Sequence, residues 1–244
     1  MIYFVTGTDT DSGKTLISSA LLNLATRKTA LAKITVAKTT EAKTTEAKTL
    51  GVKPIASGCI ETDAGLRNSD ALSLIEQSTI TLDYNQINPI AFKPAIAPHI
   101  AAKQQGVSLT ASGIVDLLPL EALNSAEFAL IEGAGGWRLP LSKGQYLSQS
   151  VQQLAQQNDV GVILVVGMKL GCLNHALLTQ EAIEADGLNI AAWVANQVDP
   201  EMSEIEENLS SLKELMTAPF LGYVPYLSEP TAINAAVHID NSTL

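Results

Sequence analysis

Residues 7–15 have the residue types of a phosphate-binding loop. They read GTDTDSGKT and lie between an apolar run and a helical pattern. Such a loop needs backbone N–H groups at a helix N-terminus, a glycine beside the phosphates, a lysine for the β/γ oxygens and a hydroxyl for Mg²⁺. Gly13, Lys14 and Thr15 supply the last three. Gly7 lies one position too early for the usual G-x-x-x-x-G-K-[ST] spacing, so the interpretation depends on Gly-Lys-Thr and its surroundings, and an ordinary N-capped helix start is the alternative.

Lys53 and Glu132 each come at the end of a short apolar run. Pro54 has no backbone N–H, so the strand ladder is expected to end there and to leave Lys53 near the carboxyl edge of a sheet, where open α/β folds bind ligands. Glu132 precedes Gly133-Ala134-Gly135, a pattern suited to a second magnesium contact and to close backbone approach to phosphate. A surface lysine and a plain turn acid are the competing interpretations.

Three polar side chains at expected element ends allow two interpretations each. Asp70, in the sequence RNSD before a helical pattern, is either a helix N-cap or an acidic metal contact, and the sequence alone favours the cap because caps are common. Asn196 and Gln197 follow a strand pattern. Their amide groups match the donor and acceptor edge of adenine, although asparagine is also common in plain turns.

These residues must be positioned by strands and helices that alternate along the chain. Apolar and β-branched runs predict strands, and helical periodicity predicts helices between many of them. Strands are expected at residues 2–6, 52–56, 128–131, 160–166, 190–195 and 221–224, and helices at 14–25, 148–157, 174–185 and 203–216. The alternation predicts an α/β fold of P-loop NTPase type, with a single doubly wound, mostly parallel sheet flanked by helices, in one domain over residues 1–244.

Residues 29–49 interrupt this pattern with a five-residue repeat. They read TALAK, ITVAK, TTEAK, TTEAK, T. Five residues advance a helix by about 500°, so no sustained apolar face forms and the segment is expected to stay outside the core. We interpret it as a low-complexity insertion between the first helix and the second strand, either a solvated helical extension or a mobile loop, and assign it no function.

The charge balance argues against partners held by bulk positive charge. The chain has 15 Lys and Arg against 25 Asp and Glu, a formal net charge of −10, so neither nucleic acid nor an anionic membrane is expected as a partner. The 46% hydrophobic content suffices for a core. With no targeting signal and no apolar run long enough to span a bilayer, a cytoplasmic location is expected. Cys59 and Cys172 are interpreted as inert apolar residues.

Together these blocks resemble the dethiobiotin synthetase family. The resemblance is carried, in chain order, by TGTDT with GKT, KP with SG, RNSDA, EGAGGW, VVG with KLGC and NHA, and VAN. It implies ATP-dependent carboxylation and ring closure of 7,8-diaminopelargonate with CO₂, which yields dethiobiotin, ADP and phosphate in biotin biosynthesis. One amine captures CO₂ as a carbamate, the carbamate attacks the γ-phosphate, and the other amine closes the ring on the mixed anhydride.

The resemblance also implies roles for individual residues. Lys14 and Lys53 are the implied catalytic residues, which stabilise the carbamate and the transferring phosphoryl group. Thr15, Asp70 and Glu132 are the implied Mg²⁺ ligands, a role that replaces the cap for Asp70. The implied ATP contacts are Asp11, Ser12, Gly13, Lys14, Thr15, Leu16, Asp70, Glu132, Gly133, Ala134, Gly135, Asn196, Gln197, Pro225, Tyr226 and Leu227. The implied substrate contacts are Thr10, Ser57, Gly171, Cys172, Leu173 and Asn174.

The segment from Gly171 to Asn174 implies a homodimer with shared active sites, because in the family this segment receives the substrate's tail carboxylate from the neighbouring subunit.

The chain departs from the family at two places. Asp11-Ser12 stand where the family usually has Glu-Val, and Gln197 stands where it has Asp. A switch-type P-loop ATPase of the partitioning or cell-division-positioning class is the alternative. Residues 8–12 lack the second lysine of that class, and residues 231–244 contain no Lys or Arg.

Overall fold

A central sheet of six parallel strands organises the chain. The computed structural model describes residues 1–36 and 47–244, and the side chains of all these residues except 28–36. The strand order is β10-β9-β8-β1-β7-β2, and every pairing is parallel, which confirms the predicted α/β fold. The strands are β1 (Ile2–Gly7), β2 (Thr49–Val52), β7 (Phe128–Gly136), β8 (Val160–Met168), β9 (Ile190–Gln197) and β10 (Phe220–Val224).

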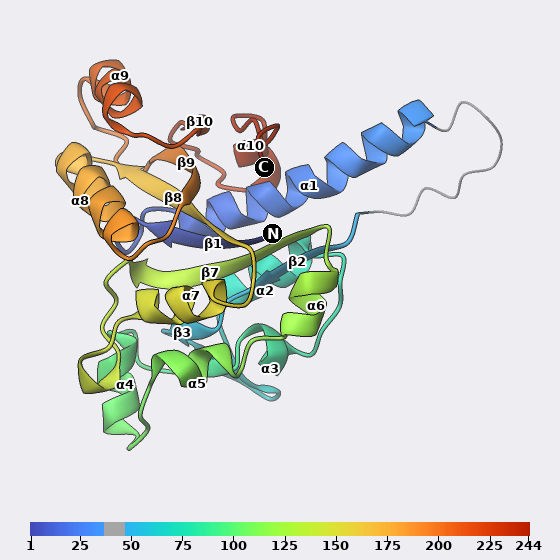
Figure 1. Cartoon of the computed structure of the whole chain (residues 1–244), viewed down its shortest axis with the longest axis vertical. Coiled ribbons are helices and arrows are strands. Elements are labelled where there is room, and N and C mark those ends of the chain that lie inside the picture. The colour runs from blue at the N-terminus through green and yellow to red at the C-terminus, as the bar shows by residue number, and fades with distance from the viewer. Residues whose placement is uncertain (37–46) are drawn as a thin grey trace.

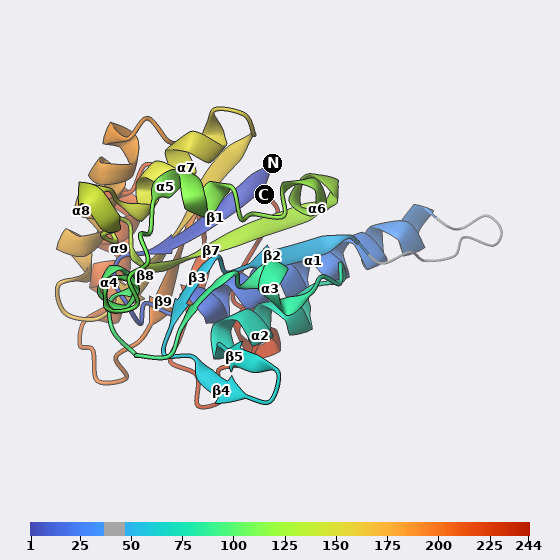
Figure 2. The ribbon, with the colours of Figure 1, turned by 90° about the horizontal axis from the view of Figure 1, so that it is seen from below.

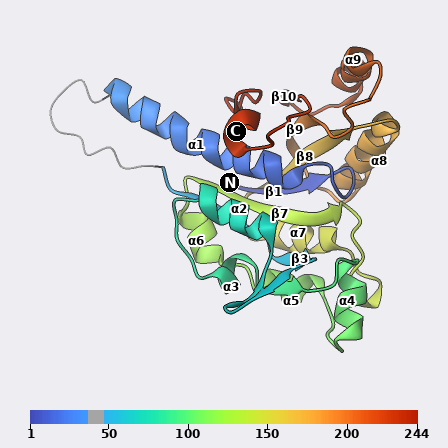
Figure 3. The same cartoon turned by 180° about the vertical axis from the view of Figure 1, so that it is seen from behind.

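Helices cover both faces of this sheet (Figure 1). In Figure 2, α5 and α7 lie on one side of the central strands and α1 and α2 on the other, and Figure 3 shows the α1 and α2 side. The core is accordingly split, since Phe4 packs in one apolar cluster and its neighbours Tyr3 and Val5 pack in the other. The main helices are α1 (Lys14–Val36), α2 (Ser69–Gln77), α5 (Ala111–Val115), α7 (Leu147–Ala155), α8 (Cys172–Ala185), α9 (Ile205–Leu215) and α10 (Ala232–Ala236).

Short elements fill the segment between β2 and β7. Two of its strands pair in parallel and two form an antiparallel hairpin. The elements are β3 (Ile55–Ser57) with β6 (Ile90–Phe92), β4 (Ile60–Thr62) with β5 (Gly65–Arg67), α3 (Tyr84–Ile87), α4 (Pro98–Gln104) and α6 (Leu120–Ser125). Apart from residues 55–56 of β3, which fall in the strand expected at 52–56, none of these was predicted, because runs of three to seven residues are too short for periodicity to identify.

Two predicted strands need correction. The expected strand at 52–56 is two strands: β2 ends at Val52, the Lys53 N–H donates to the Ile87 carbonyl at 2.9 Å, and β3 pairs with β6 outside the main sheet. The other strand, β7, does not end at Glu132 but continues to Gly136. Glu132 therefore lies inside β7, paired with Val5 of β1.

The strand order creates a switch point at β1. β1 lies between β7 and β8, and the chain connects it to β2 on the β7 side and later to β9 and β10 on the β8 side. Crevices at the carboxyl ends of strands around such a point are where open α/β sheets bind ligands. The candidate residues that follow β1, β2 and β10, and those that end β9, all lie at the carboxyl ends of these strands.

The repeat segment is helical at its start and buried at its end. α1 continues to Val36 and projects past the sheet in Figure 1, which confirms the helical extension for residues 29–36, whereas residues 37–46 lie outside the described residues. The expectation that the whole segment stays outside the core is wrong at its end. Ala47 is 1% exposed, Thr49 begins β2, and the Ala47 carbonyl accepts a hydrogen bond from Thr79 Oγ1 at 2.6 Å.

Two expectations from composition can be compared with the described residues. None of their helices is both long and apolar enough to cross a membrane. Cys59 and Cys172 are both free and buried, and burial raises the pKa of each thiol. Neither cysteine is therefore poised as a thiolate nucleophile.

Candidate active site

The loop between β1 and α1 is held in a tight, partly left-handed conformation. Gly13 has φ +88° and Asp11 has φ +60°. A Cβ at Gly13 would lie 2.1 Å from Asn196 Nδ2, which donates to the Ser12 carbonyl at 3.0 Å. Only glycine fits both this backbone conformation and this contact. The end of β9 thus fixes the loop whose N–H groups open α1.

Lys14, the first residue of α1, folds back along this loop. Its side chain is buried, and Nζ donates to the Asp9 carbonyl at 3.0 Å. Burial, reinforced by the positive charge of Lys53, lowers the pKa of Lys14, although nearby carboxylates oppose the shift. The ammonium therefore adds a poorly hydrated positive charge to the mouth of the loop, which suits an anionic ligand.

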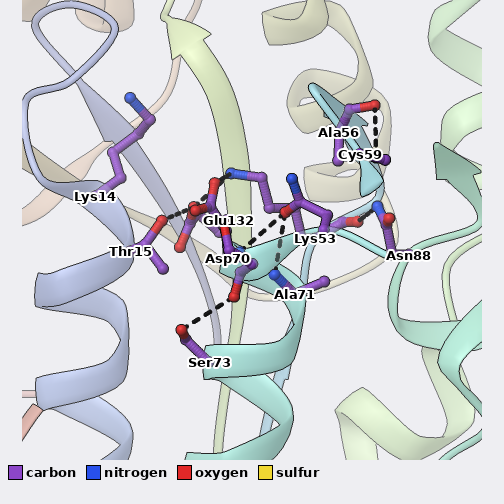
Figure 4. Close-up of polar contacts among 12 residues, drawn as sticks. Lys14, Thr15, Lys53, Ala56, Cys59, Asp70, Ala71, Ser73, Asn88 and Glu132 are labelled. Carbon is purple, nitrogen blue, oxygen red and sulfur yellow. Dashed lines mark hydrogen bonds and ion pairs between the residues drawn. The ribbon is translucent and has the colours of Figure 1, made fainter. Parts of the chain in front are cut away.

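Lys53 joins the two carboxylates predicted to bind metal. Its Nζ lies 2.6 Å from Glu132 Oε1 and 2.7 Å from Asp70 Oδ2, and Thr15 Oγ1 donates to the same Glu132 oxygen at 2.7 Å. Figure 4 shows the Lys53 ammonium at the two carboxylates, while Lys14 points away from them. Burial alone would lower the pKa of Lys53, but Glu132 and then Asp70 outweigh it and raise this pKa. Lys53 is therefore a firmly charged ammonium.

Local structure places both partners of this cluster. The Lys53 backbone is fixed where β2 ends, because its N–H bonds to Ile87 and its carbonyl accepts from Asn88 Nδ2 at 2.7 Å. Asp70 lies in the first turn of α2. Glu132 is fixed by its place in β7 and is fully buried. Carboxylates from α2 and β7 thus meet at the ammonium of Lys53, which follows β2.

The N-cap of α2 is Asn68, so the sequence-only preference for Asp70 as the cap is wrong. Asn68 Oδ1 accepts from the backbone N–H of Asp70 at 3.1 Å and of Ala71 at 3.2 Å. The Asp70 side chain is thereby left to bind Lys53. The RNSD sequence contains three residues that can cap a helix, and pattern alone did not separate them.

A hydrogen-bonded chain links the two sides of the cluster. Tyr84 Oη accepts from the Asn68 N–H at 2.7 Å and donates to Asn88 Oδ1 at 3.0 Å, and Asn88 in turn binds the Lys53 carbonyl. Asn68, Tyr84 and Asn88 were not identified from the sequence as site residues. Asn88 lies next to Pro89, a turn signal that could have suggested a structural role.

The residues around Lys53 fit a magnesium ion. Thr15, Asp70 and Glu132 offer one hydroxyl and two carboxylates, which are hard oxygen donors, and Glu132 Oε2 is buried without a hydrogen-bond partner among the described residues. The described residues contain no group of three or more His, Cys, Asp and Glu that could hold a metal by themselves. Mg²⁺ bound by one or two carboxylates takes its other oxygen ligands from substrate phosphates and water.

The predicted adenine end gathers at the ends of β9 and β10, but its amides bind protein atoms. Asn196 is buried and holds the Ser12 carbonyl. Gln197 Oε1 accepts from Tyr223 Oη at 2.7 Å and from the Tyr226 N–H at 3.1 Å. The structure thus brings Gln197 together with residues 225–227, and it uses both amides to fix the loops around this end of the site.

A pocket adjoins the phosphate loop without reaching Lys14 or Lys53. It has a volume of about 700 Å³ and runs from Thr15 along α1 toward α10. Its lining includes Leu16, Ser19, Glu76 and Glu229, but neither Lys14 nor Lys53. It is large enough for part of a nucleotide.

The predicted substrate residues fall into two groups. Thr10 lies close to Gly135, where an added Cβ would be 3.8 Å from Thr10 Oγ1, and Ser57 ends β3 with its Oγ unpartnered among the described residues. Gly171, with φ +94°, precedes α8, which begins at Cys172. Between the groups, Lys169 Nζ binds Asp9 Oδ2 at 2.8 Å, and this hydrogen bond lowers the pKa of Asp9.

Comparison with known proteins gives concordant results. A family model described as an AAA domain matches residues 2–234. The chain is 47% identical over 242 residues to the ATP-dependent dethiobiotin synthetase BioD of Cellvibrio japonicus, covering 99% of this chain and 96% of that protein. It is 48% identical over 238 residues to the protein of the same name from Pseudomonas aeruginosa strain UCBPP-PA14, covering 98% and 95%.

A solved structure supports the fold. The MinC:MinD cell division protein complex of Aquifex aeolicus contains a chain with a TM-score of 0.50 and 13% identity to this one. The match covers 97% of this chain and 87% of that chain. At this identity the likeness concerns the fold only.

Proposed function

The chain belongs to the ATP-dependent dethiobiotin synthetases, the ATP-binding ligases of biotin biosynthesis, and we propose that Lys53 and Lys14 are its catalytic residues. The observation that carries this assignment is the cluster in which the buried Lys53 and Glu132 meet the partly exposed Asp70 beside Thr15. A cation fixed beside a phosphate-binding loop stabilises negative charge on transferring oxygens.

The proposed reaction joins 7,8-diaminopelargonate and CO₂ at the expense of ATP. The carbamate formed on one amine is an anion that must approach another anion, the γ-phosphate. Lys14 at the loop mouth and Lys53 at the end of β2 supply the positive charge that offsets this repulsion. Burial of both ammonium groups excludes water, which strengthens their attraction to the phosphoryl group and protects the mixed anhydride from hydrolysis.

Residues on the chain also position ATP. The N–H groups that open α1 after Gly13 are available to phosphate oxygens, and Gly133 to Gly135 allow close backbone approach from β7. We also propose ATP contacts in two segments at the carboxyl edge of the sheet, Asp11 to Leu16 after β1 and residues 225–227 after β10. Magnesium, held by Thr15, Asp70 and Glu132, would neutralise charge on the β- and γ-phosphates.

The substrate's tail and the oligomer form the remaining part of the proposal. Residues 171–174 surround the N-terminus of the 14-residue helix α8, which favours a carboxylate. Leu170, beside it, is 95% exposed and is therefore accessible to a second subunit. We therefore include a homodimer that shares its active sites and, because ATP is the co-substrate, a cytoplasmic location.

Phosphate release from ATP tests this function. The purified protein is expected to release phosphate only when 7,8-diaminopelargonate and bicarbonate are both present, with dethiobiotin formed in equal amount. Leaving out the diamine is the control. Release that is independent of the diamine would contradict the proposal and would favour a switch-type ATPase.

A further inference from the structure

The Lys53 ammonium binds two carboxylates that are also proposed magnesium ligands. Lys53 Nζ binds Glu132 Oε1 and Asp70 Oδ2 at 2.6 and 2.7 Å, and Thr15 donates to the same Glu132 oxygen. Glu132 and Asp70, together with Thr15, are the proposed metal ligands. The two cations therefore share two carboxylate ligands.

Distance and charge make this sharing exclusive. Magnesium binds oxygen at about 2.0–2.1 Å, so an ion bound to either oxygen of these carboxylates would lie close to an ammonium held by the same groups. The Glu132 side chain is fully buried and that of Lys53 is 6% exposed, so water screens the repulsion between the two cations poorly.

The Lys53 side chain can leave the carboxylates without disturbing its own backbone. Its backbone is held on both sides, by Ile87 at the N–H and by Asn88 at the carbonyl. The ammonium sits on a flexible four-carbon stem, so a change of side-chain rotamer is sufficient to move it.

We propose that Lys53 and magnesium compete for the Glu132 and Asp70 carboxylates, so that arrival of the metal with ATP moves the Lys53 ammonium off the carboxylates and onto the phosphate oxygens. This inference rests on the proposed magnesium site. Lys53 thus holds the two carboxylates together as a substitute counter-ion and turns to the phosphoryl group when the metal replaces it. The catalytic cation is delivered only to a loaded site.

Binding of Mn²⁺ to the ATP-free protein, followed by electron paramagnetic resonance of the free ion, tests the competition. Lys53→Met should bind Mn²⁺ about tenfold more tightly than the unmodified protein, or better, although it is expected to be inactive. Lys53→Arg, which keeps the charge, should bind as weakly as the unmodified protein. Lys93→Met is the matched control, because Lys93 also pairs with a glutamate at 2.7 Å but on the exposed surface.

Equal or weaker Mn²⁺ binding by Lys53→Met would overturn the inference, and so would an equal gain in Lys93→Met. If Lys53→Met is unfolded without metal, thermal unfolding replaces the titration: recovery of a folding transition on addition of Mn²⁺ supports competition, and no recovery contradicts it. The wild-type phosphate assay is separate. If the unmodified protein shows diamine-dependent turnover while Lys53→Met binds Mn²⁺ no more tightly than the unmodified protein, this inference fails and the proposed function stands.

Discussion

At the scale of single residues, the buried carboxylate of Glu132 depends on Lys53. Glu132 has no exposed surface, and Lys53 is the ammonium bound to it. Removing one partner of a buried ion pair leaves an uncompensated charge, which typically costs about 3–5 kcal/mol. We therefore expect Lys53→Met to lower the free energy of unfolding by an amount in this range, measured by urea denaturation without added metal.

The double variant Lys53→Met with Glu132→Gln separates this effect from a simple loss of packing. Neutralising both partners should make the double variant at least about 1 kcal/mol more stable than the sum of the two single changes predicts. Additive effects in this cycle would show that the pair is not coupled in folding.

At the scale of elements, the cap of α2 determines how Asp70 is presented. Asn68→Ala removes the acceptor for the Asp70 and Ala71 N–H groups. The expected loss of stability is about 1 kcal/mol. Because Asp70 would then be less well fixed, we also expect the KM for magnesium-ATP to rise several-fold with a smaller change in kcat.

Two further substitutions serve as controls for this prediction. Asn68→Asp retains a capping oxygen and should restore most of both losses. Thr110→Ala removes the N-cap of α5, whose Oγ1 accepts from the Gly113 N–H at 3.1 Å, and should cost a similar amount of stability but leave the KM unchanged. A KM effect of equal size in Thr110→Ala would mean that the KM follows stability and not the position of Asp70.

The pair of Asp9 and Lys169 joins the phosphate-binding loop to the segment before α8. Lys169 holds the pKa of Asp9 below its ordinary value, so the pair's contribution to stability is present above about pH 3.9 and is lost as the pH falls through the lowered pKa. Since both side chains are partly exposed, this contribution is expected to be below about 1 kcal/mol at neutral pH.

Lys169→Met should therefore be less stable than the unmodified protein at pH 7, and the two unfolding free energies should converge as the pH falls below the lowered pKa of Asp9. NMR titration of the Asp9 carboxyl should show its pKa moving up toward the ordinary value in the variant. An unchanged pKa would contradict a role for the hydrogen bond.

The elements differ in how far the sequence could predict them. Long apolar runs such as residues 160–166 identify β8 because a strand buried on both faces has no other composition. Glu132 shows the limit: four small residues, Gly133 to Gly136, end the apolar run but not the strand, since pairing with β1 and not composition decides where β7 stops. The hydrogen-bonded chain through Tyr84 depends on tertiary contacts that local pattern does not contain.

At the scale of the whole molecule, the proposed sharing of active sites between two subunits predicts complementation between two inactive variants. Lys14→Met disables the phosphate-binding loop, and Gly171→Val strains the segment before α8, where φ is +94°. In a mixed dimer, one of the two sites combines an intact loop with an intact partner segment. Equal amounts of the two variants, dissociated and reassembled together, should recover about a quarter of wild-type activity. No recovery, with mixed dimers demonstrated by mass spectrometry, would contradict a site built from two subunits.

The number of repeats before β2 should matter less to the molecule than the residue that the last repeat delivers to the core. Ala47 is 1% exposed, so the five-residue period has a structural consequence at this one position. Deleting residues 44–48 brings Ala42-Lys43 in front of Thr49 and restores the same local sequence. Because a shorter connection changes the free energy only slightly, this variant should keep wild-type turnover and an unfolding free energy within about 1 kcal/mol.

Deleting only the four residues 44–47 places Lys43 where Ala47 was. A lysine in a site with no exposed surface has to be desolvated or has to distort the start of β2, so we expect a loss of about 2 kcal/mol or more. Urea denaturation of the two variants measures the difference. Equal stability would show that β2 can begin without a small buried residue before it, whereas a severe loss of activity in the five-residue deletion would mean that the repeat reaches the active site.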